Sequence, residues 1–310
     1  MSRIHEALTR AEHERATAPM ADEAPGVEAI PDGIRRDAQA PGRSDTAAAV
    51  ASKSIFTQTL VAPLPTEHLT LESLRAHCSQ RHWKLLPNIN VFANPSITAH
   101  AAEQFRTLRS RLYQIRGEQQ LRSILVTSAV PSEGKSFVTS NLAQALVRQA
   151  GRSALIIDAD LRRPHLHVPL GASSSPGLSE YLRGDADETA VIQRGLDEDL
   201  FFIPGGSTVT NPSELLLNGR MKTLLNRMMP IFNWVIVDSP PCLMVSDARV
   251  IADLCDAILL VVRAASTPVA SAQRARQELQ GKNVLGAVLN SVESGASYGS
   301  YYYDYGKPKE

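Results

Sequence analysis

The stretch SILVTSAVPSEGKS, residues Ser123–Ser136, decides the fold. Its first half is an apolar run that predicts a buried strand, and its second half, Ala129–Ser136, has the spacing of a phosphate-binding loop. A helix is predicted to follow from Phe137 to Gln149, so strand, loop and helix succeed one another as such a loop requires. Ala129 stands where this loop usually has glycine, which requires a backbone outside the left-handed region. A chance GKS in a surface loop is the alternative.

The loop predicts a site for ATP and Mg²⁺. Backbone N–H groups would point at the phosphates, Lys135 would reach the β and γ oxygens, and the Ser136 hydroxyl would coordinate magnesium. The residues assigned to nucleotide binding on this basis are Ser132, Glu133, Gly134, Lys135, Ser136 and Phe137.

Further apolar runs predict a largely parallel sheet. The segments between them are long enough for crossover helices, at 140–150, 213–229 and 268–280, and a charged helix with one apolar face is expected from about 99 to 116. The expected fold class is therefore α/β, a doubly wound and mostly parallel P-loop NTPase domain. The runs, each predicted to be a strand buried on both faces, are 123–127, 154–157, 200–203, 234–237, 257–262 and 284–289.

The remaining sequence predicts extensions around this domain, which itself is expected at 96–293. The chain before it is poor in apolar residues over much of its length, and such composition does not form a packed core. For the first segment, a frayed and solvated helix is the alternative to a docking helix. The expected parts are an amphipathic docking helix at 1–16, a disordered linker at 17–54, a small adaptor region with a helix near 69–77 at 55–95, and a tyrosine-rich tail at 294–310.

The composition of the chain argues against several classes of function and site. Acidic and basic residues balance at 32 each, which gives no global electrostatic reason for nucleic-acid binding. The three cysteines, Cys78, Cys242 and Cys255, lie far apart and predict neither a disulfide framework nor a zinc site, which fits a reducing cytoplasm. The apolar runs are too short to cross a bilayer, so we expect a soluble chain.

Acidic residues follow two predicted strands at the edge where the phosphate loop lies. Asp158 and Asp160 belong to LIIDADLR, and Asp238 belongs to WVIVDSPP. One acid of the first pair can orient or deprotonate an attacking hydroxyl while the other helps to hold magnesium, and Asp238 can bind magnesium through water. The alternatives are a capping aspartate beside a solvated one, and an ordinary strand end. The assigned catalytic residues are Lys135, Asp158, Asp160 and Asp238, and the assigned magnesium ligands are Ser136, Asp160 and Asp238.

Together these motifs resemble the bacterial tyrosine kinases, or BY-kinases, which are related to MinD-like ATPases, over about 96–292. The Walker A loop, the DxDxR motif at Asp158–Arg162 and a Walker B motif ending in DxxP are all present, and DLRRPHLH, GLSEYLRG and NPSELL also look like family sequence. The resemblance implies an ATP-dependent protein-tyrosine kinase whose paired acids activate the tyrosine and bind magnesium. It also implies that Asn290, at the end of the last strand, contacts adenine, with a plain strand-end turn as the alternative.

The C-terminal tail supplies a second signal. Five of the seven tyrosines lie among Gly, Ser and Asp, where glycines give the flexibility that a tethered substrate needs. This cluster resembles the one in which BY-kinases autophosphorylate between subunits. An aromatic terminus that binds a partner by stacking is the alternative. The expected phosphoacceptors are Tyr298, Tyr301, Tyr302, Tyr303 and Tyr305.

The segment EQFRTLR matches the ExxRxxR motif of that family. Its Glu103, Arg106 and Arg109 are three residues apart, which places them on one side of a helix. In the family this motif forms salt bridges between protomers of a ring, so the resemblance implies a homo-oligomer. A solvated charged face is the alternative.

The resemblance also implies a biological setting. It places the protein in the cytoplasm, peripheral to the inner membrane, in the control of extracellular polysaccharide synthesis or export, with a separate membrane protein of the chain-length-determinant type as activator. A MinD-like ATPase switch and a nucleotide-gated scaffold are the competing functions. MinD-like loops carry an early lysine, as in KGGxGK, that AVPSEGK lacks, and a scaffold would not need both Asp158 and Asp160.

Overall fold

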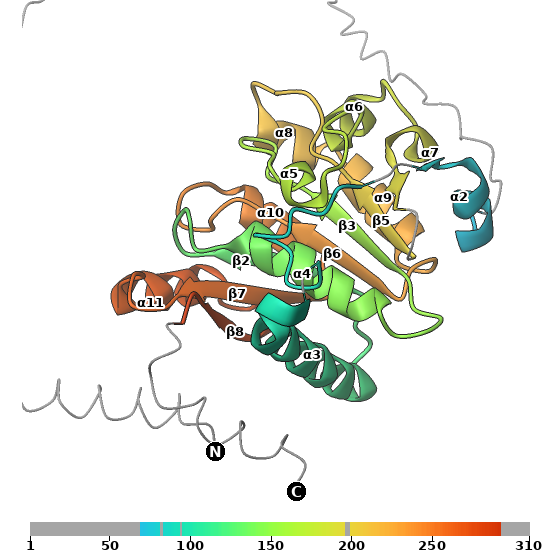
Figure 1. Ribbon diagram of the computed structural model, residues 1–310. Helices are drawn as coiled ribbons and strands as arrows, with labels where there is room; N and C mark the ends of the chain where they lie inside the picture. Colours follow the sequence, from blue (N-terminus) through green and yellow to red (C-terminus); the bar gives the residue numbers. More distant parts are fainter. Residues whose placement is uncertain (1–68, 81–82, 94, 196–198, 293–310) are drawn as a thin grey trace, which may run out of the picture. The chain divides into compact units, whose positions relative to one another are not determined.

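The computed structural model describes residues 69–80, 83–93, 95–195 and 199–292 (Figure 1). The predicted docking helix, the linker and the tail with its five tyrosines lie outside these residues. Within the described residues, no helix combines the length and the apolar character that crossing a bilayer needs.

The domain is built on one eight-stranded sheet with the order β1-β4-β5-β3-β6-β2-β7-β8. All neighbouring strands are parallel except β4 and β5, so the predicted α/β fold is confirmed. The strands are β1 (Ser79–Gln80), β2 (Ser123–Ser128), β3 (Ala154–Asp158), β4 (Gln193–Arg194), β5 (Leu200–Ile203), β6 (Trp234–Asp238), β7 (Ala257–Arg263) and β8 (Val284–Asn290).

Helices cover both faces of this sheet. Alternate residues of one strand point to opposite sides, so Ile157 belongs to one apolar core and Ile156 to the other. The first core includes Leu224 of α9 and the second includes Leu142 of α4, which is the doubly wound arrangement predicted. The helices are α2 (Leu71–His77), α3 (Pro95–Glu118), α4 (Lys135–Val147), α5 (His167–Leu170), α6 (Leu178–Arg183), α7 (Glu188–Val191), α8 (Pro212–Leu217), α9 (Arg220–Met228), α10 (Asp247–Ala252) and α11 (Val269–Glu278).

The prediction that segment 284–289 is buried on both faces is wrong. β2, β3, β5 and β6 are buried along their whole length, but β8 has exposed residues that include Leu289. Among the strands of the described residues, β8 pairs with β7 alone and forms an edge of the sheet. An edge strand has one neighbour, so an apolar run of the same composition can lie half in solvent.

The crossover predicted at 213–229 consists of two helices, α8 and α9. The chain turns at Gly219, whose φ of 85° suits glycine best. The Asn218 side chain accepts the Arg220 N–H within this turn (2.9 Å) and donates to the Leu182 carbonyl of α6 (2.8 Å). The segment therefore forms two helices joined by a turn at Asn218 and Gly219 instead of one continuous helix.

The described part of the segment predicted as an adaptor region packs against this domain. Leu74 of α2 is fully buried in the first core, and β1 extends the sheet beside β4. The Val91 N–H donates to Asn141 Oδ1 of α4 at 2.9 Å. Residues 69–93 thus contribute to the same core as the P-loop.

Candidate active site

The phosphate-binding loop connects β2, in the middle of the sheet, to α4. Its backbone has positive φ at Ser132 (64°) and at Gly134 (91°), whereas Ala129 lies outside that region, as its methyl group requires. A Cβ atom on Gly134 would lie 2.0 Å from Asn290 Nδ2, so a side chain here would displace that amide and would also be strained at a φ of 91°. The loop ends on the N-terminus of α4, where backbone N–H groups and the helix dipole favour a phosphate.

Ser136 and Asp238 meet beneath this loop. The Ser136 hydroxyl donates to Asp238 Oδ2 at 2.6 Å, and Thr139 Oγ1 donates to Asp238 Oδ1 at 3.2 Å. Asp238 is buried, and burial is the main reason that its pKa is raised to about 6, although the bond from Ser136 and the charge of Lys135 act in the opposite direction. Lys135 itself is 8% exposed.

Asp158 lies beside Asp238, because the two residues are paired in the register of β3 and β6. It is fully buried, and its carboxylate accepts the N–H groups of Asp160 (3.2 Å), His165 (3.1 Å) and Leu166 (3.0 Å). Burial, followed by the charge of Asp238, raises its pKa well above the ordinary value. Asp158 therefore holds the segment that follows β3 in place.

Asp160 is less buried than Asp158 and belongs to the same group of charges. Its Oδ1 accepts the Arg163 N–H at 3.1 Å. Burial raises its pKa, while the Arg163 bond and the charge of Lys135 act to lower it. The structure thus brings the predicted catalytic residues Lys135, Asp158, Asp160 and Asp238 to one edge of the sheet, at the P-loop.

This set of donors fits a magnesium nucleotide. Burial raises the pKa of Asp158 and Asp238, and a divalent cation nearby would stabilise their ionised forms. Mg²⁺ prefers oxygen ligands such as the Ser136 hydroxyl and the Asp238 carboxylate. In P-loop sites one or two protein ligands suffice, because phosphate oxygens and water supply the others. Accordingly, no group of three or more His, Cys, Asp or Glu side chains in the described residues is arranged to hold a metal ion.

The side chain of Glu133 has a role that sequence reasoning missed. It is 1% exposed and turns into the protein, where Oε2 accepts the Val130 N–H at 2.7 Å. Its Oε1 accepts the Thr267 hydroxyl and the Arg263 N–H (3.4 Å). These partners follow Glu133 by about 130 residues, so no local pattern indicates them. The carboxylate anchors the loop to the end of β7.

Glu133→Gln is expected to raise the Kd for ATP about tenfold while the fold is retained. The amide has one acceptor oxygen instead of two, so it cannot accept both the Val130 N–H and the Arg263 N–H, and one of them loses its bond to this side chain, at about 1–3 kcal/mol for a group left unsatisfied. Nucleotide titration and thermal unfolding measure the two quantities. Thr267→Val is the matched variant: it removes the hydroxyl that donates to Glu133 and accepts the Arg263 N–H (3.1 Å), leaves both Glu133 oxygens in place, and should have the smaller effect. An unchanged Kd in Glu133→Gln would contradict this role.

Arg162 and Asp247 form a second unpredicted contact, although both lie in stretches that the sequence singles out. Arg162 Nε donates to Asp247 Oδ2 (2.8 Å) and Nη2 to Oδ1 (3.1 Å), and Asp247 is fully buried. The Ser213 hydroxyl of α8 donates to the same carboxylate. This bidentate ion pair holds the DxDxR segment against α10 and α8. The paired residues are 85 positions apart, which hides the pair from sequence patterns.

The other predicted residues occupy different places. Asn290 Nδ2 donates to the Glu133 carbonyl at 2.9 Å, so the end of β8 holds the P-loop, and a contact with adenine stays a prediction. The ring of Phe137 is partly buried and packs edge-on against Phe105 of α3 with centroids 5.9 Å apart, and a contact with the nucleotide stays a prediction.

The ExxRxxR motif of α3 is divided between two contacts. Glu103 and Arg106 form an exposed ion pair with each other at 2.9 Å. Arg109 instead donates to the Ala145 carbonyl of α4 at 2.8 Å. A role of the three residues between protomers stays a prediction.

Comparisons with known proteins find relatives among the bacterial tyrosine-protein kinases. The chain is 38% identical over 220 residues to tyrosine-protein kinase etk of Escherichia coli (strain K12), a match that covers 70% of this chain and 30% of that protein. It is 32% identical over 216 residues to tyrosine-protein kinase YwqD of Bacillus subtilis (strain 168), which covers 68% of this chain and 91% of YwqD. The chain thus spans about a third of the length of etk but nearly all of YwqD. No family model matches the sequence.

A solved structure extends the likeness to the fold. The kinase domain of Escherichia coli tyrosine kinase ETK is 36% identical in sequence to this chain and superposes on it with a TM-score of 0.59. The superposition covers 64% of this chain and 78% of the ETK domain. The likeness thus extends over about two thirds of this chain in both sequence and fold. The chain belongs to the family of bacterial tyrosine-protein kinases.

Proposed function

We propose that this chain transfers the γ-phosphate of ATP to tyrosines in the C-terminal cluster of a second copy of itself. The observation that carries this proposal is the convergence of Lys135, Asp160 and Asp238 at a P-loop whose backbone is shaped for phosphate. Phosphoryl transfer needs little more than positioning and charge stabilisation, and these groups supply both. The tail supplies five tyrosines in one short segment.

Each residue has a definite role in the proposed reaction. The P-loop amides and Lys135 hold the phosphates and oppose the charge that develops on them. The phenolic oxygen forms a bond to the γ-phosphorus as the bond from that phosphorus to the β–γ bridging oxygen breaks, so that ADP is the leaving group. The phenolic proton passes to Asp160, because Asp158 is fully buried and its oxygens already accept three backbone N–H groups. Ser136 and Asp238 would hold Mg²⁺, which neutralises phosphate charge when bound.

The proposal also includes the oligomeric state of the protein, its membrane activator and its biological role. The resemblance to the BY-kinase family supports a homo-oligomeric ring, with Glu103, Arg106 and Arg109 at its interface, and a separate membrane activator of the chain-length-determinant type. It also supports control of extracellular polysaccharide synthesis or export from the cytoplasmic side of the membrane. Phosphate groups add negative charge to the tail, so phosphorylated tails should repel one another and loosen such a ring.

The proposal predicts that purified protein incubated with ATP and Mg²⁺ acquires phosphotyrosine within residues 298–305, as mapped by mass spectrometry. Changing all five tail tyrosines to phenylalanine should remove at least about nine-tenths of the label, because the covalently tethered tail is the substrate that is present at the highest effective concentration. The matched control is Tyr113→Phe, whose residue lies on α3, and it should leave the label unchanged. ATP hydrolysis without phosphotyrosine would instead support the ATPase switch.

A further inference from the structure

A cleft of about 720 Å³ lies where the end of α4 meets α3. α4 begins at Lys135 and is 13 residues long, so the cleft is about 20 Å from the P-loop, near the opposite edge of the sheet. The phosphate transfer proposed above therefore does not use it. The residues that line the cleft are Arg109, Ser110, Tyr113, Arg148, Gln149 and Ala150.

Two arginine side chains at this cleft are held by uncharged groups. Arg109 Nη1 donates to the Ala145 carbonyl of α4 at 2.8 Å. Arg152 stacks over the Tyr113 ring, with its Cζ atom 5.5 Å from the ring centroid. Among the described residues, neither guanidinium group forms an ion pair with a carboxylate. The contacts thus fix both groups in position without neutralising them.

Two further arginines extend this positive charge along the same edge of the sheet. Arg116 donates to the Asn233 carbonyl at 2.7 Å, and Arg122 donates to the Met229 carbonyl at 3.2 Å. Burial lowers the pKa of Arg116, and the charges of Arg122 and Arg152 act in the same direction. Like charges therefore lie close together here and destabilise one another.

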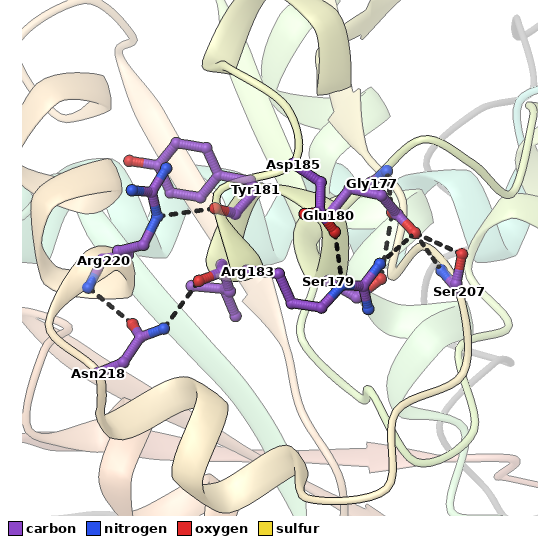
Figure 2. Close-up of polar contacts among 10 residues, drawn as sticks. Gly177, Ser179, Glu180, Tyr181, Arg183, Asp185, Ser207, Asn218 and Arg220 are labelled. Carbon is purple, nitrogen blue, oxygen red and sulfur yellow. Dashed lines mark hydrogen bonds and ion pairs between the residues drawn. The ribbon is translucent and has the colours of Figure 1, made fainter. Parts of the chain in front are cut away.

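An acidic side chain nearby does not pair with these guanidinium groups. Asp256 Oδ2 accepts the backbone N–H groups of Arg122 and of the residue after it, both at 2.8 Å, and makes no ion pair with an arginine in the part of the chain that the structure describes. Figure 2 shows the contrasting arrangement, in which Arg183 pairs with Glu180 at 3.1 Å and with Asp185 at 2.7 Å. An anion bound at the cleft would supply the negative charge that is missing there.

The Tyr113 side chain supplies a second, independent signal. Its hydroxyl oxygen is buried and has no hydrogen-bond partner within the described ranges. The ring packs edge-on against the fully buried Trp234, with centroids 5.7 Å apart, and the indole N–H of Trp234 is likewise buried without a partner there. Buried polar atoms of this kind are uncommon in folded proteins. Both groups can donate, which suits a ligand rich in oxygen.

Charge and size together select the class of ligand. A guanidinium group binds two oxygens of a phosphate through parallel N–H groups, and a single phosphate ester carries about −1.5 to −2 at pH 7. One such group would leave several of these arginines without a counter-charge. The volume of about 720 Å³ lies in the range of pockets for small molecules. We propose that this cleft binds a soluble small molecule with two or more phosphate groups, such as a nucleoside diphosphate or an oligophosphate.

The place of the cleft in the fold gives such a ligand a consequence. It would contact α3, which carries the ExxRxxR motif, and the end of α4, whose other end holds Lys135 of the P-loop. Arg109, the third residue of that motif, would belong to the ligand site. The inference does not depend on the proposed kinase function, because it concerns binding alone.

The test titrates the full chain with tripolyphosphate in a calorimeter, in EDTA and with excess ADP to occupy the P-loop. We expect one binding event per chain. Arg148→Gln with Arg152→Gln should raise its Kd at least about tenfold, because two positive charges at the cleft are removed. Arg148→Lys with Arg152→Lys keeps both charges and should raise the Kd about threefold, since an ammonium group lacks the planar fork. Thermal unfolding checks the fold, and the lysine pair still tests the site if the glutamine pair unfolds.

Two control variants show where the event takes place. Arg274→Gln with Arg276→Gln removes the same charge from exposed positions of α11 and should leave the Kd for tripolyphosphate within twofold. Lys135→Met should also leave it within twofold. A Kd that rises in Lys135→Met and not in the glutamine pair at 148 and 152 would place the event at the P-loop and overturn the inference.

A phospholipid surface offers the same phosphate chemistry and is distinguished by sedimentation. The full chain is mixed with phosphatidylcholine vesicles that contain roughly a third phosphatidylglycerol. We expect the glutamine pair at 148 and 152 to sediment with these vesicles to the same extent as the parent. Vesicle binding that this pair abolishes, without any binding of tripolyphosphate by the parent, would overturn the inference in favour of a membrane surface.

Discussion

Lys135→Met should lower the rate of tyrosine phosphorylation by about 10²–10³-fold, the usual cost of removing one group that stabilises transition-state charge. The Lys135 ammonium group lies close enough to Asp160 and Asp238 to influence their pKa values, which places it where the phosphates bind. Methionine has a similar length and no charge, and Lys135 is 8% exposed, so the fold should persist. Initial rates of phosphotyrosine and ADP formation measure the effect.

The matched control for this variant is Lys222→Met. Lys222 is an exposed residue of α9, so its replacement removes the same charge from a surface position and should leave the rate within twofold. A Lys135→Met protein that retains more than about a tenth of the parental rate would show that the loop does not act as a nucleotide phosphate site.

Asp238→Asn should stabilise the nucleotide-free protein and at the same time abolish most of its activity. In the folded protein the pKa of Asp238 is about 6, against 3.8 ordinarily, so the ionised carboxylate at pH 7 costs on the order of 3 kcal/mol. Asparagine keeps the shape, removes the charge and can still bond Ser136 and Thr139. A gain of this size corresponds to about 5–10 °C in Tm for a domain of this length.

The pH dependence of this gain has a definite sign. Because the folded state binds the Asp238 proton more tightly than the unfolded chain, this group's contribution to stability falls as pH rises from about 4 to 6 and is level above 6. Asp238→Asn should therefore raise Tm by the whole amount given above at pH 7, and its Tm should equal that of the parent near pH 4. Thermal unfolding without nucleotide or magnesium, with the exposed Glu278→Gln as the neutral control, measures it.

The loss of activity in Asp238→Asn has a separate measurement. The affinity for ATP in the presence of Mg²⁺ should fall about tenfold or more, because a neutral amide is a poor ligand for this cation. The affinity measured with EDTA should change little. A variant that is less stable than the parent at pH 7, or one that binds magnesium nucleotide equally well, would contradict the electrostatic account of the site.

The main strands were predictable because of their burial. Parallel strands at the centre of a sheet are covered on both faces, so six apolar runs marked β2, β3, β5, β6, β7 and β8. β1 and β4 were missed because strands of two residues are too short to show any periodicity. The exposure of β8 was missed because composition does not reveal which strand lies at an edge.

The sequence by itself determined which residues meet at the nucleotide site. The motifs end parallel strands, and the carboxyl ends of such strands lie at one edge of a sheet, where β3, β6 and β2 are neighbours and bring Lys135, Asp158, Asp160 and Asp238 together. Only the tertiary structure decided what each side chain does there. Glu133 turns away from the phosphates to Thr267, and Arg162 reaches Asp247, because partners separated by 85 residues or more are chosen by the packing of whole elements and leave no trace in local spacing.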